Sequence, residues 1–270
     1  MCSSDLHSFV TQRPPGSPFV FTLDADPHNG DTNASPALYE VALANARSDR
    51  PDFHLTLGDT FMTEKLAVTT ESAAVRTYTD MRRHVTVLGA EAPYFLVQGN
   101  HDPELGWLLD GTTRTMAAWG VAARRAWFPT PVPGAFYRGA TIAEAVGGIR
   151  DGYYAFTWGD ALFVMIDPYW SSPVCVDNNF FGVDKRTDLW SVTHGDAQYQ
   201  WLKRTLEQST AKYKFVFAHH VLGSQRGGVE VARLYEWGGL GANGQNVFAA
   251  QRPTWAAPIH QLFVQNHVTA

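Results

Sequence analysis

Cysteine, charge and long apolar runs are all scarce in this chain. Two of its 270 residues are cysteines, which is too few for a disulfide framework. Charged residues make up only 17% and give a net charge of −5 without any basic run, so a groove that neutralises nucleic-acid phosphates is not expected. No apolar run reaches the length of a transmembrane helix, and we expect no membrane span.

Core-forming residues, by contrast, are plentiful: hydrophobic residues make up 45% and aromatic residues 13%, enough for one large domain or two modest ones. Apolar runs alternate with helical patterns in the first hundred residues, and this order favours parallel strands. Strands are predicted at Phe19–Leu23, Phe53–Leu57 and 94–98, and helices from Ser35-Pro36 and over 71–88. The first helix would bury the face formed by Leu38, Val41, Ala42 and Ala46.

The remainder of the chain predicts a mixture of helices, a hairpin and further strands. The hairpin would pair Tyr153–Trp158 with Ala161–Ile166, another strand would be Phe215–Ala218, and a new strand would start at 268–270. Helices are expected around Met116–Arg125, after a cap at Asp196 with the apolar face Tyr199, Leu202 and Leu206, and after Pro258. A Gly-rich loop is expected over 223–246.

Polar side chains directly follow four of the expected strands. The most informative are those of the tetrapeptide Gly99-Asn100-His101-Asp102, which put an amide and an imidazole at the carboxyl end of a buried strand. Open α/β sheets bind their ligands at that end. The other three strand ends carry Asp26 with His28, Gly58 with Asp59, and His219 with His220.

These strand ends would converge on one patch of carboxylate, imidazole and amide groups if the strands lie side by side. Such oxygen and nitrogen donors suit two borderline or hard divalent ions, Mn, Fe or Zn. They do not indicate a thiolate site. Asp59 is the natural bridge between two ions, because the preceding Gly58 lets the backbone approach closely. Two ions roughly 3.5–4 Å apart lower the pKa of a shared water and clamp the oxygens of an in-line phosphoryl displacement.

In this order, Asp-x-His, Gly-Asp, Gly-Asn-His-Asp and a strand-end His resemble the motifs of the calcineurin-like metallophosphoesterases. The resemblance covers about residues 18–270. It implies an α/β fold, a four-layer αββα sandwich of two mixed β-sheets flanked by helices. It also implies that metal-bound hydroxide attacks a small phosphorylated substrate, either a phosphomonoester or a phosphodiester. A nuclease of the same fold is the third possibility, and the acidic charge balance argues against it.

The resemblance also implies a role for each motif residue. By this reading, Asp26 and His28 bind the first metal, Asp59 bridges, and Asn100 and His219 bind the second metal. His101 would protonate the leaving alkoxide or stabilise the developing charge, and Asp102 would orient it. Either His219 or His220 fits the strand-end ligand, and the family alignment favours the first.

Two departures from the family pattern matter for function. The closing Gly-His-x-His of the family is absent, which we interpret as truncation at the C-terminus; the alternative is a catalytically impaired fragment or pseudoenzyme that binds phosphate ligands. Purple acid phosphatases carry Tyr three residues after the bridging Asp, whereas Met62 stands here, so tyrosinate-to-iron charge transfer is not expected. Arg226 and Arg233 could contact a phosphate, although a solvated loop charge is the simpler reading.

The domain expectation follows from the same resemblance. Residues 1–17 would be a connector, with a start that fits no fold element and a tail like that of a β-sandwich domain that precedes some secreted family members. Residues 18–270 would be the metallophosphoesterase domain, incomplete at its C-terminus. A secreted or periplasmic location is therefore expected, while the oligomeric state stays open.

Overall fold

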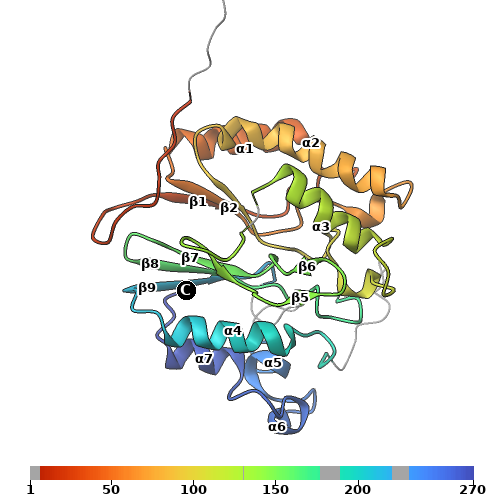
Figure 1. The fold of residues 1–270 in the computed structure, drawn as a ribbon, viewed down its shortest axis with the longest axis vertical. Coiled ribbons are helices and arrows are strands. Elements are labelled where there is room, and N and C mark those ends of the chain that lie inside the picture. The colour runs from red at the N-terminus through yellow and green to blue at the C-terminus, as the bar shows by residue number, and fades with distance from the viewer. Residues whose placement is uncertain (1–6, 130, 177–188, 221–230) are drawn as a thin grey trace, which may run out of the picture.

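Two β-sheets lie face to face between two layers of helices in the computed structural model of the chain (Figure 1). The structure describes residues 7–129, 131–176, 189–220 and 231–270. Helices α1, α2 and α3 cover the outer face of one sheet, and α4, α5 and α7 cover the outer face of the other. The predicted αββα sandwich is confirmed. Within the described residues, no helix combines the length and apolarity needed to cross a bilayer.

In the described residues the first sheet is parallel, as the strand–helix alternation predicts, and not mixed as the resemblance implies. Its strand order is β1-β2-β3, and each connection runs through a helix on the outer face. The elements are β1 (Phe21–Asp24), α1 (Pro36–Ser48), β2 (Phe53–Thr56), α2 (Glu71–Gly89) and β3 (Tyr94–Leu96). Because all three strands run the same way, their carboxyl ends and the loops that follow lie at one edge of the sheet.

Helix α1 begins where the sequence predicts, but it buries a different face. The Ser35 side chain caps the helix by accepting a hydrogen bond from the backbone N–H of Leu38. Leu38 and Val41, expected in the core, are 68% and 54% exposed, whereas Leu43 is 1% exposed and packs with Tyr39 and Ala46. The buried stripe follows the spacing i, i+4, i+7 from Tyr39, so the predicted stripe is rotated by about one residue, or roughly 100°.

The second sheet is mixed, with strand order β4-β7-β8-β9. The predicted hairpin is confirmed as an antiparallel pair, and β9 lies parallel to β8. Residues 268–270 do not form the expected strand, but backbone hydrogen bonds from Thr269 N to Lys214 O (2.7 Å) and from Val216 N to Ala270 O (2.8 Å) tie them to β9. The strands are β4 (Arg138–Gly139), β7 (Tyr154–Trp158), β8 (Ala161–Met165) and β9 (Tyr213–Phe217); a small separate sheet pairs β5 (Ala143–Glu144) with β6 (Gly148–Ile149).

The helices and turns not yet described are only partly as predicted. The remaining helices are α3 (Met116–Trp127), α4 (Gly195–Glu207), α5 (Tyr235–Gly238), α6 (Phe248–Gln251) and α7 (Ile259–Gln265), with 3-10 turns η1 (Thr63–Lys65) and η2 (Gly106–Leu108). The predicted face of α4 is buried, but its N-cap is His194 and not Asp196. Asp196 lies in the first turn and accepts a hydrogen bond from Trp255 Nε1 at 2.6 Å. Helix α5 interrupts the expected Gly-rich loop, of which residues 223–230 lie outside the described part.

Aromatic rings fill the space between the two sheets. Phe53 of β2 lies 5.1 Å from Phe163 of β8, and Phe95 of β3 lies 4.4 Å from Phe156 of β7, measured between ring centroids. Alternate residues of a strand point to opposite faces, so Phe53 and Leu55 face this core while His54 faces the helices. This packing fixes the two sheets relative to each other and therefore fixes the loops at their edges.

Candidate metal centre

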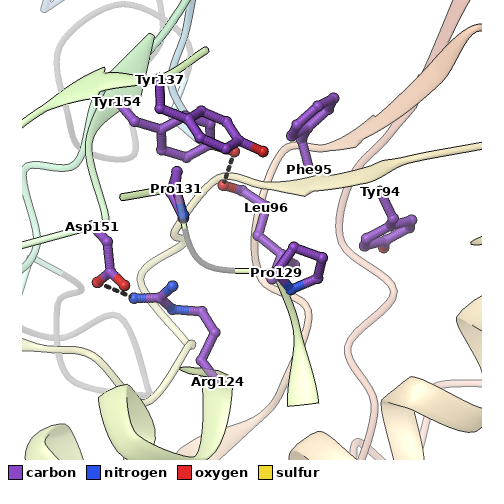
Figure 2. Close-up of a pocket in the computed structure, with 9 residues that line it drawn as sticks. All are labelled: Tyr94, Phe95, Leu96, Arg124, Pro129, Pro131, Tyr137, Asp151 and Tyr154. Atoms are coloured by element: carbon purple, nitrogen blue, oxygen red, sulfur yellow. Dashed lines mark hydrogen bonds and ion pairs between the residues drawn. The ribbon is translucent and has the colours of Figure 1, made fainter. Parts of the chain in front are cut away.

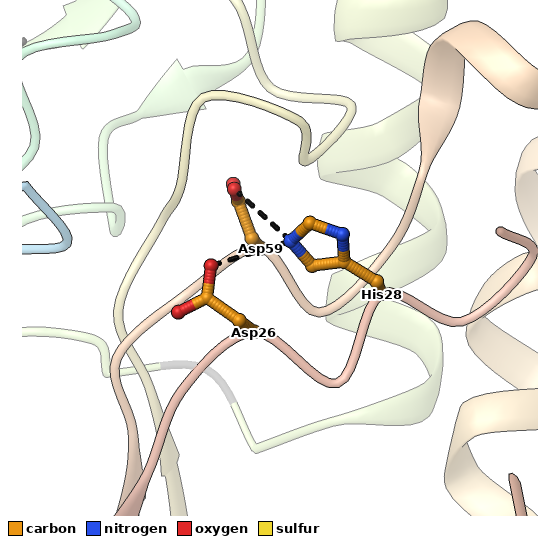
Figure 3. Close-up of side chains that lie close together, drawn as sticks. All are labelled: Asp26, His28 and Asp59. Carbon is orange, nitrogen blue, oxygen red and sulfur yellow. Dashed lines mark hydrogen bonds and ion pairs between the residues drawn. The ribbon is translucent and has the colours of Figure 1, made fainter. Parts of the chain in front are cut away.

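The loops after β1 and β2 bring three predicted ligands together. One ligand atom from each of Asp26, His28 and Asp59 lies within 4.8 Å of the others (Figure 3). In the described part of the chain, this is the one group of three possible metal ligands that lie so close together. His28 Nε2 lies 3.2 Å from Asp26 Oδ1 and 3.5 Å from Asp59 Oδ2. Figure 3 shows the imidazole edge facing both carboxylates. The expected convergence of these strand ends is therefore seen.

An unusual backbone holds these three residues in place. Asp26, His28 and Asp59 adopt positive φ values of 59°, 48° and 50°. This conformation is uncommon for residues other than glycine and costs on the order of 1 kcal/mol or more each, so it persists only where neighbours enforce it. Hydrogen bonds from Asp26 N to Gly58 O and from His28 N to Asp59 O, both 3.0 Å, tie the two loops together.

A close approach between two loops requires glycine at position 99. A Cβ added to Gly99 would collide with the backbone nitrogen and the Oδ1 of Asp59. The glycine of the Gly-Asn-His-Asp motif therefore lets the loop after β3 pass directly against Asp59. In that position the backbone N–H of His101 donates a hydrogen bond of 2.8 Å to Asp59 Oδ1.

Asp59 lies at the centre of the group and is 3% exposed. Its Oδ2 lies 3.0 Å from His219 Nε2 and 3.9 Å from His101 Nε2. Burial alone would raise the pKa of Asp59, but the hydrogen bonds with His219 and His28 outweigh it and hold the pKa below its ordinary value. Asp59 is therefore anionic and is shared between imidazoles from both sheets.

The two neighbouring imidazoles respond to Asp59 in the opposite direction. The hydrogen bond with Asp59 raises the pKa of His28, and burial opposes this only in part. Burial lowers the pKa of His219, but its hydrogen bond with Asp59 outweighs that effect and the net pKa is raised. Both rings are thus held in place by the carboxylate that would bridge two ions.

The consecutive histidines after β9 point to different partners. His219 Nδ1 lies 3.0 Å from Leu57 O, and because a carbonyl only accepts, Nδ1 carries the hydrogen and Nε2 faces Asp59. A hydrogen bond from the other ring nitrogen to a backbone carbonyl is typical of metal-binding histidines. His220 Nδ1 instead lies 3.1 Å from the Tyr169 hydroxyl. Of the two alternatives left open by the sequence, the geometry favours His219.

Asn100 and His101 lie in the buried loop after β3, with 4% and 8% exposure. The rings of His101 and His28 are 5.6 Å apart between centroids, so His101 faces the same centre. Its Nδ1 forms an ion pair with the Glu64 carboxylate from η1. Sequence reasoning missed Glu64; the one available signal was an acidic residue five positions after Asp59 in the loop of the same motif.

The described contacts of the Asp102 carboxylate are with backbone groups. Its carboxylate accepts backbone N–H hydrogen bonds from Gly99 (2.7 Å), Asp59 (3.1 Å) and Phe61 (3.0 Å). These bonds tie the loop that carries Asp59 to the loop that carries His101, and the expectation that Asp102 orients the His101 ring stays a prediction. Burial, with the nearby charge of Asp59, raises the pKa of Asp102 to about 7.

Of the two arginines considered as phosphate contacts, only Arg233 lies in the described part of the chain. Arg233 is exposed, Tyr235 and Trp237 are 7% and 4% exposed within the core of the second helical layer, and Arg226 lies outside the described residues. A separate pocket lies between β3 and β7 (Figure 2). Two of its polar contacts are internal to the fold, with Arg124 bonded to Asp151 and the Tyr154 hydroxyl donating to Leu96 O at 2.9 Å.

The donors at the centre fit divalent ions of the Mn, Fe and Zn type. Asp26, His28 and Asp59 place two carboxylates and an imidazole within reach of one position, His219 contacts Asp59 from the other sheet, and Asn100 lies in the adjoining loop. Mixed oxygen and nitrogen donors of this kind select borderline divalent metals. A single carboxylate contacted by histidines from separate loops is the arrangement that a bridging ligand requires.

Comparisons with known proteins agree with this geometry. The model of the calcineurin-like phosphoesterase family matches residues 1–241. No curated protein sequence matches the chain. Among solved structures, the purple acid phosphatase PPD1 from seeds of yellow lupin (Lupinus luteus) is similar with a TM-score of 0.53 and 14% identity, over 95% of this chain and 38% of that chain. This likeness concerns the fold, and the chain spans well under half of the lupin protein. Because the family match covers most of its length, the chain belongs to the calcineurin-like phosphoesterase family.

Proposed function

We propose that this chain hydrolyses phosphoric esters with two divalent metal ions. Asp26, His28 and Asp59 would hold the first ion, and Asp59, Asn100 and His219 the second. The observation that carries the proposal is the position of the Asp59 carboxylate, which His28 and His219 approach to 3.5 Å and 3.0 Å from different loops. Family membership supports the same reaction class.

The residues around the ions would each have a separate task. Two bound ions would lower the pKa of a shared water and neutralise charge on the phosphoryl oxygens. His101 presents Nε2 towards Asp59 and would donate its proton to the leaving alkoxide. The Glu64 carboxylate accepts the hydrogen of Nδ1 in the same ring, and its negative charge would favour the doubly protonated imidazolium, whose Nε2–H faces the centre. Asp102 holds both loops by their backbone N–H groups.

The proposal is tested by metal-dependent hydrolysis. The chain is stripped with a chelator, reloaded with Mn²⁺ or Zn²⁺, and assayed with p-nitrophenyl phosphate and bis(p-nitrophenyl) phosphate, which separate a monoesterase from a diesterase. Asp59→Asn should abolish turnover while circular dichroism shows an intact fold. Asp49→Asn, at an exposed position at the end of α1, is the matched control and should keep activity.

A second candidate function is binding of a phosphate ligand without turnover, which would use the same carboxylate and imidazole groups. Calorimetry with Mn²⁺, followed by inorganic phosphate, separates the two. Two metal sites with ester hydrolysis support the enzyme. A folded chain that binds metal and phosphate but hydrolyses neither ester contradicts it.

A further inference from the structure

A second cluster of polar side chains lies on the helix-facing side of the first sheet. His54 of β2 is 1% exposed, and its Nε2 lies 3.2 Å from Asp24 Oδ2 on β1. Both carboxylate oxygens of Asp24 and the Nε2 of His54 are buried, and none of these three atoms has a hydrogen-bond partner within the described structure. A buried carboxylate without hydrogen bonds is costly, and such a group calls for an unseen water, proton or ion.

The surroundings of His54 fix its ring. The Thr22 hydroxyl lies 2.8 Å from Nδ1, and the Tyr94 ring stacks on the imidazole with centroids 5.2 Å apart. If Nδ1 donates to Thr22, the lone pair of Nε2 faces an Asp24 oxygen, and two acceptors at that separation repel unless a cation lies between them. In the other tautomer the Nε2 hydrogen is not aligned with Asp24, since no hydrogen bond forms.

A third possible ligand, a hydroxyl oxygen, comes from helix α1. The Tyr39 hydroxyl lies 2.7 Å from the Tyr94 hydroxyl. Burial, with the charge of the adjacent Asp24, raises the pKa of Tyr39. Thr56 Oγ1, on the same face of β2, is also buried without a hydrogen-bond partner in the described structure. Donors from β1, β2 and α1 therefore meet at one buried point.

We propose that Asp24 and His54, with the Tyr39 hydroxyl beside them, bind one divalent cation, for which Zn²⁺ has the matching chemistry. Two donors that are each about 2.0 Å from a tetrahedral ion lie roughly 3.3 Å apart. The observed 3.2 Å between Nε2 and Oδ2 is close to this value. The site is distinct from the Asp59 centre, because Asp24 belongs to the strand and its carboxylate faces the helices, whereas Asp59 lies in a loop beyond the sheet.

The experiment isolates this site by disabling the other one. In a His28→Ala, Asp59→Ala background, Zn²⁺ is added to the chelator-treated chain, and bound zinc is measured by elemental analysis and calorimetry. One zinc per chain should remain, and it should raise the melting temperature. Adding Asp24→Asn or His54→Gln should remove both effects. His84→Gln, which alters another histidine that contacts a carboxylate between α1 and α2, is the matched control and should change neither.

Two results would overturn the proposal. One is a folded background variant that binds no zinc, and the other is zinc that persists in the folded Asp24→Asn and His54→Gln variants. If those variants do not fold, anomalous diffraction from zinc-soaked crystals of the background variant decides, since the peak must lie between Asp24 and His54. Ester hydrolysis is not part of this readout, so the failure of either proposal leaves the other testable.

Discussion

His219 Nε2 lies 3.0 Å from Asp59 Oδ2, and this contact joins the edges of the two sheets. Asp59 follows β2 in the first sheet, and His219 follows β9 in the second. The other nitrogen of the same ring bonds to Leu57 O, just before Asp59. The centre is thus complete only when the sheets pack against each other, so the aromatic core between them also sets the geometry of the site.

Replacing the two consecutive histidines should therefore have unequal effects. His219→Gln should weaken binding of Mn²⁺ by more than the roughly 10–100-fold typical of losing an outer hydrogen-bond partner, because it removes a ligand and the link to Asp59. His220→Gln should fall within that range, because His220 contacts the Tyr169 hydroxyl. Calorimetry on both folded variants measures the difference. A larger loss in His220→Gln would contradict the assignment.

Most of the fold could be predicted from apolar patterning, because strands and long helices depend on local periodicity. The three parallel strands, the β7–β8 hairpin and the buried face of α4 are confirmed. The face of α1 was not predictable, because Leu38 and Leu43 are equally apolar and only the position of α2 decides which one is buried. The N-cap of α4 was misassigned for a related reason: Asp196 is engaged by Trp255, which is distant in sequence.

The candidate site was predictable where its residues sit at strand ends, since parallel strands bring those ends together. Asp26, His28 and Asp59 meet as expected. Contacts that depend on loop conformation were not predictable. The turn η1 places Glu64 beside His101. The close contact of Gly99 with Asp59 brings the Asp102 carboxylate to the backbone N–H groups of the two loops.

Glu64 should matter for chemistry more than for metal binding. Glu64→Gln should lower kcat on aryl phosphates roughly tenfold to hundredfold, because the carboxylate no longer holds the His101 ring for proton donation. The loss of kcat should be larger for substrates with poorer leaving groups, because the departure of such a group depends more on protonation. Metal content should stay unchanged. Glu40→Gln, which alters a carboxylate bonded to His84 at the surface, is the matched control. An equal loss for all leaving groups would contradict this role.

Gly99 should tolerate no side chain. Gly99→Ala would press a methyl group against the backbone nitrogen and Oδ1 of Asp59, so the loop must shift and the metal centre with it. We expect a loss of about 1–3 kcal/mol in the free energy of unfolding, together with weaker Mn²⁺ binding. Urea unfolding and calorimetry measure the two effects. Gly134→Ala is the control, because the nearest atom to its added Cβ is Val132 O at 3.9 Å. Equal behaviour of the two variants would refute the argument.

The buried ion pairs of Asp151 should make stability depend on pH in the acid range. Asp151 is 3% exposed and bonds to Arg124 and Arg125; burial would raise its pKa, but the two guanidinium groups outweigh burial and lower the pKa from 3.8 to about 2. The ion pairs therefore stabilise the fold fully above about pH 3.8, and this contribution, about 2 kcal/mol, is lost as pH falls towards 2.

Asp151→Asn should lower the free energy of unfolding at about pH 7 by roughly 3–5 kcal/mol, because Arg124 stays buried with less compensation. In urea titrations, the gap to the unaltered chain should narrow by about 2 kcal/mol between about pH 5 and pH 2. Asp49→Asn should show no such trend, and a gap for Asp151→Asn that stays constant over this range would mean that the ion pairs contribute no net stability.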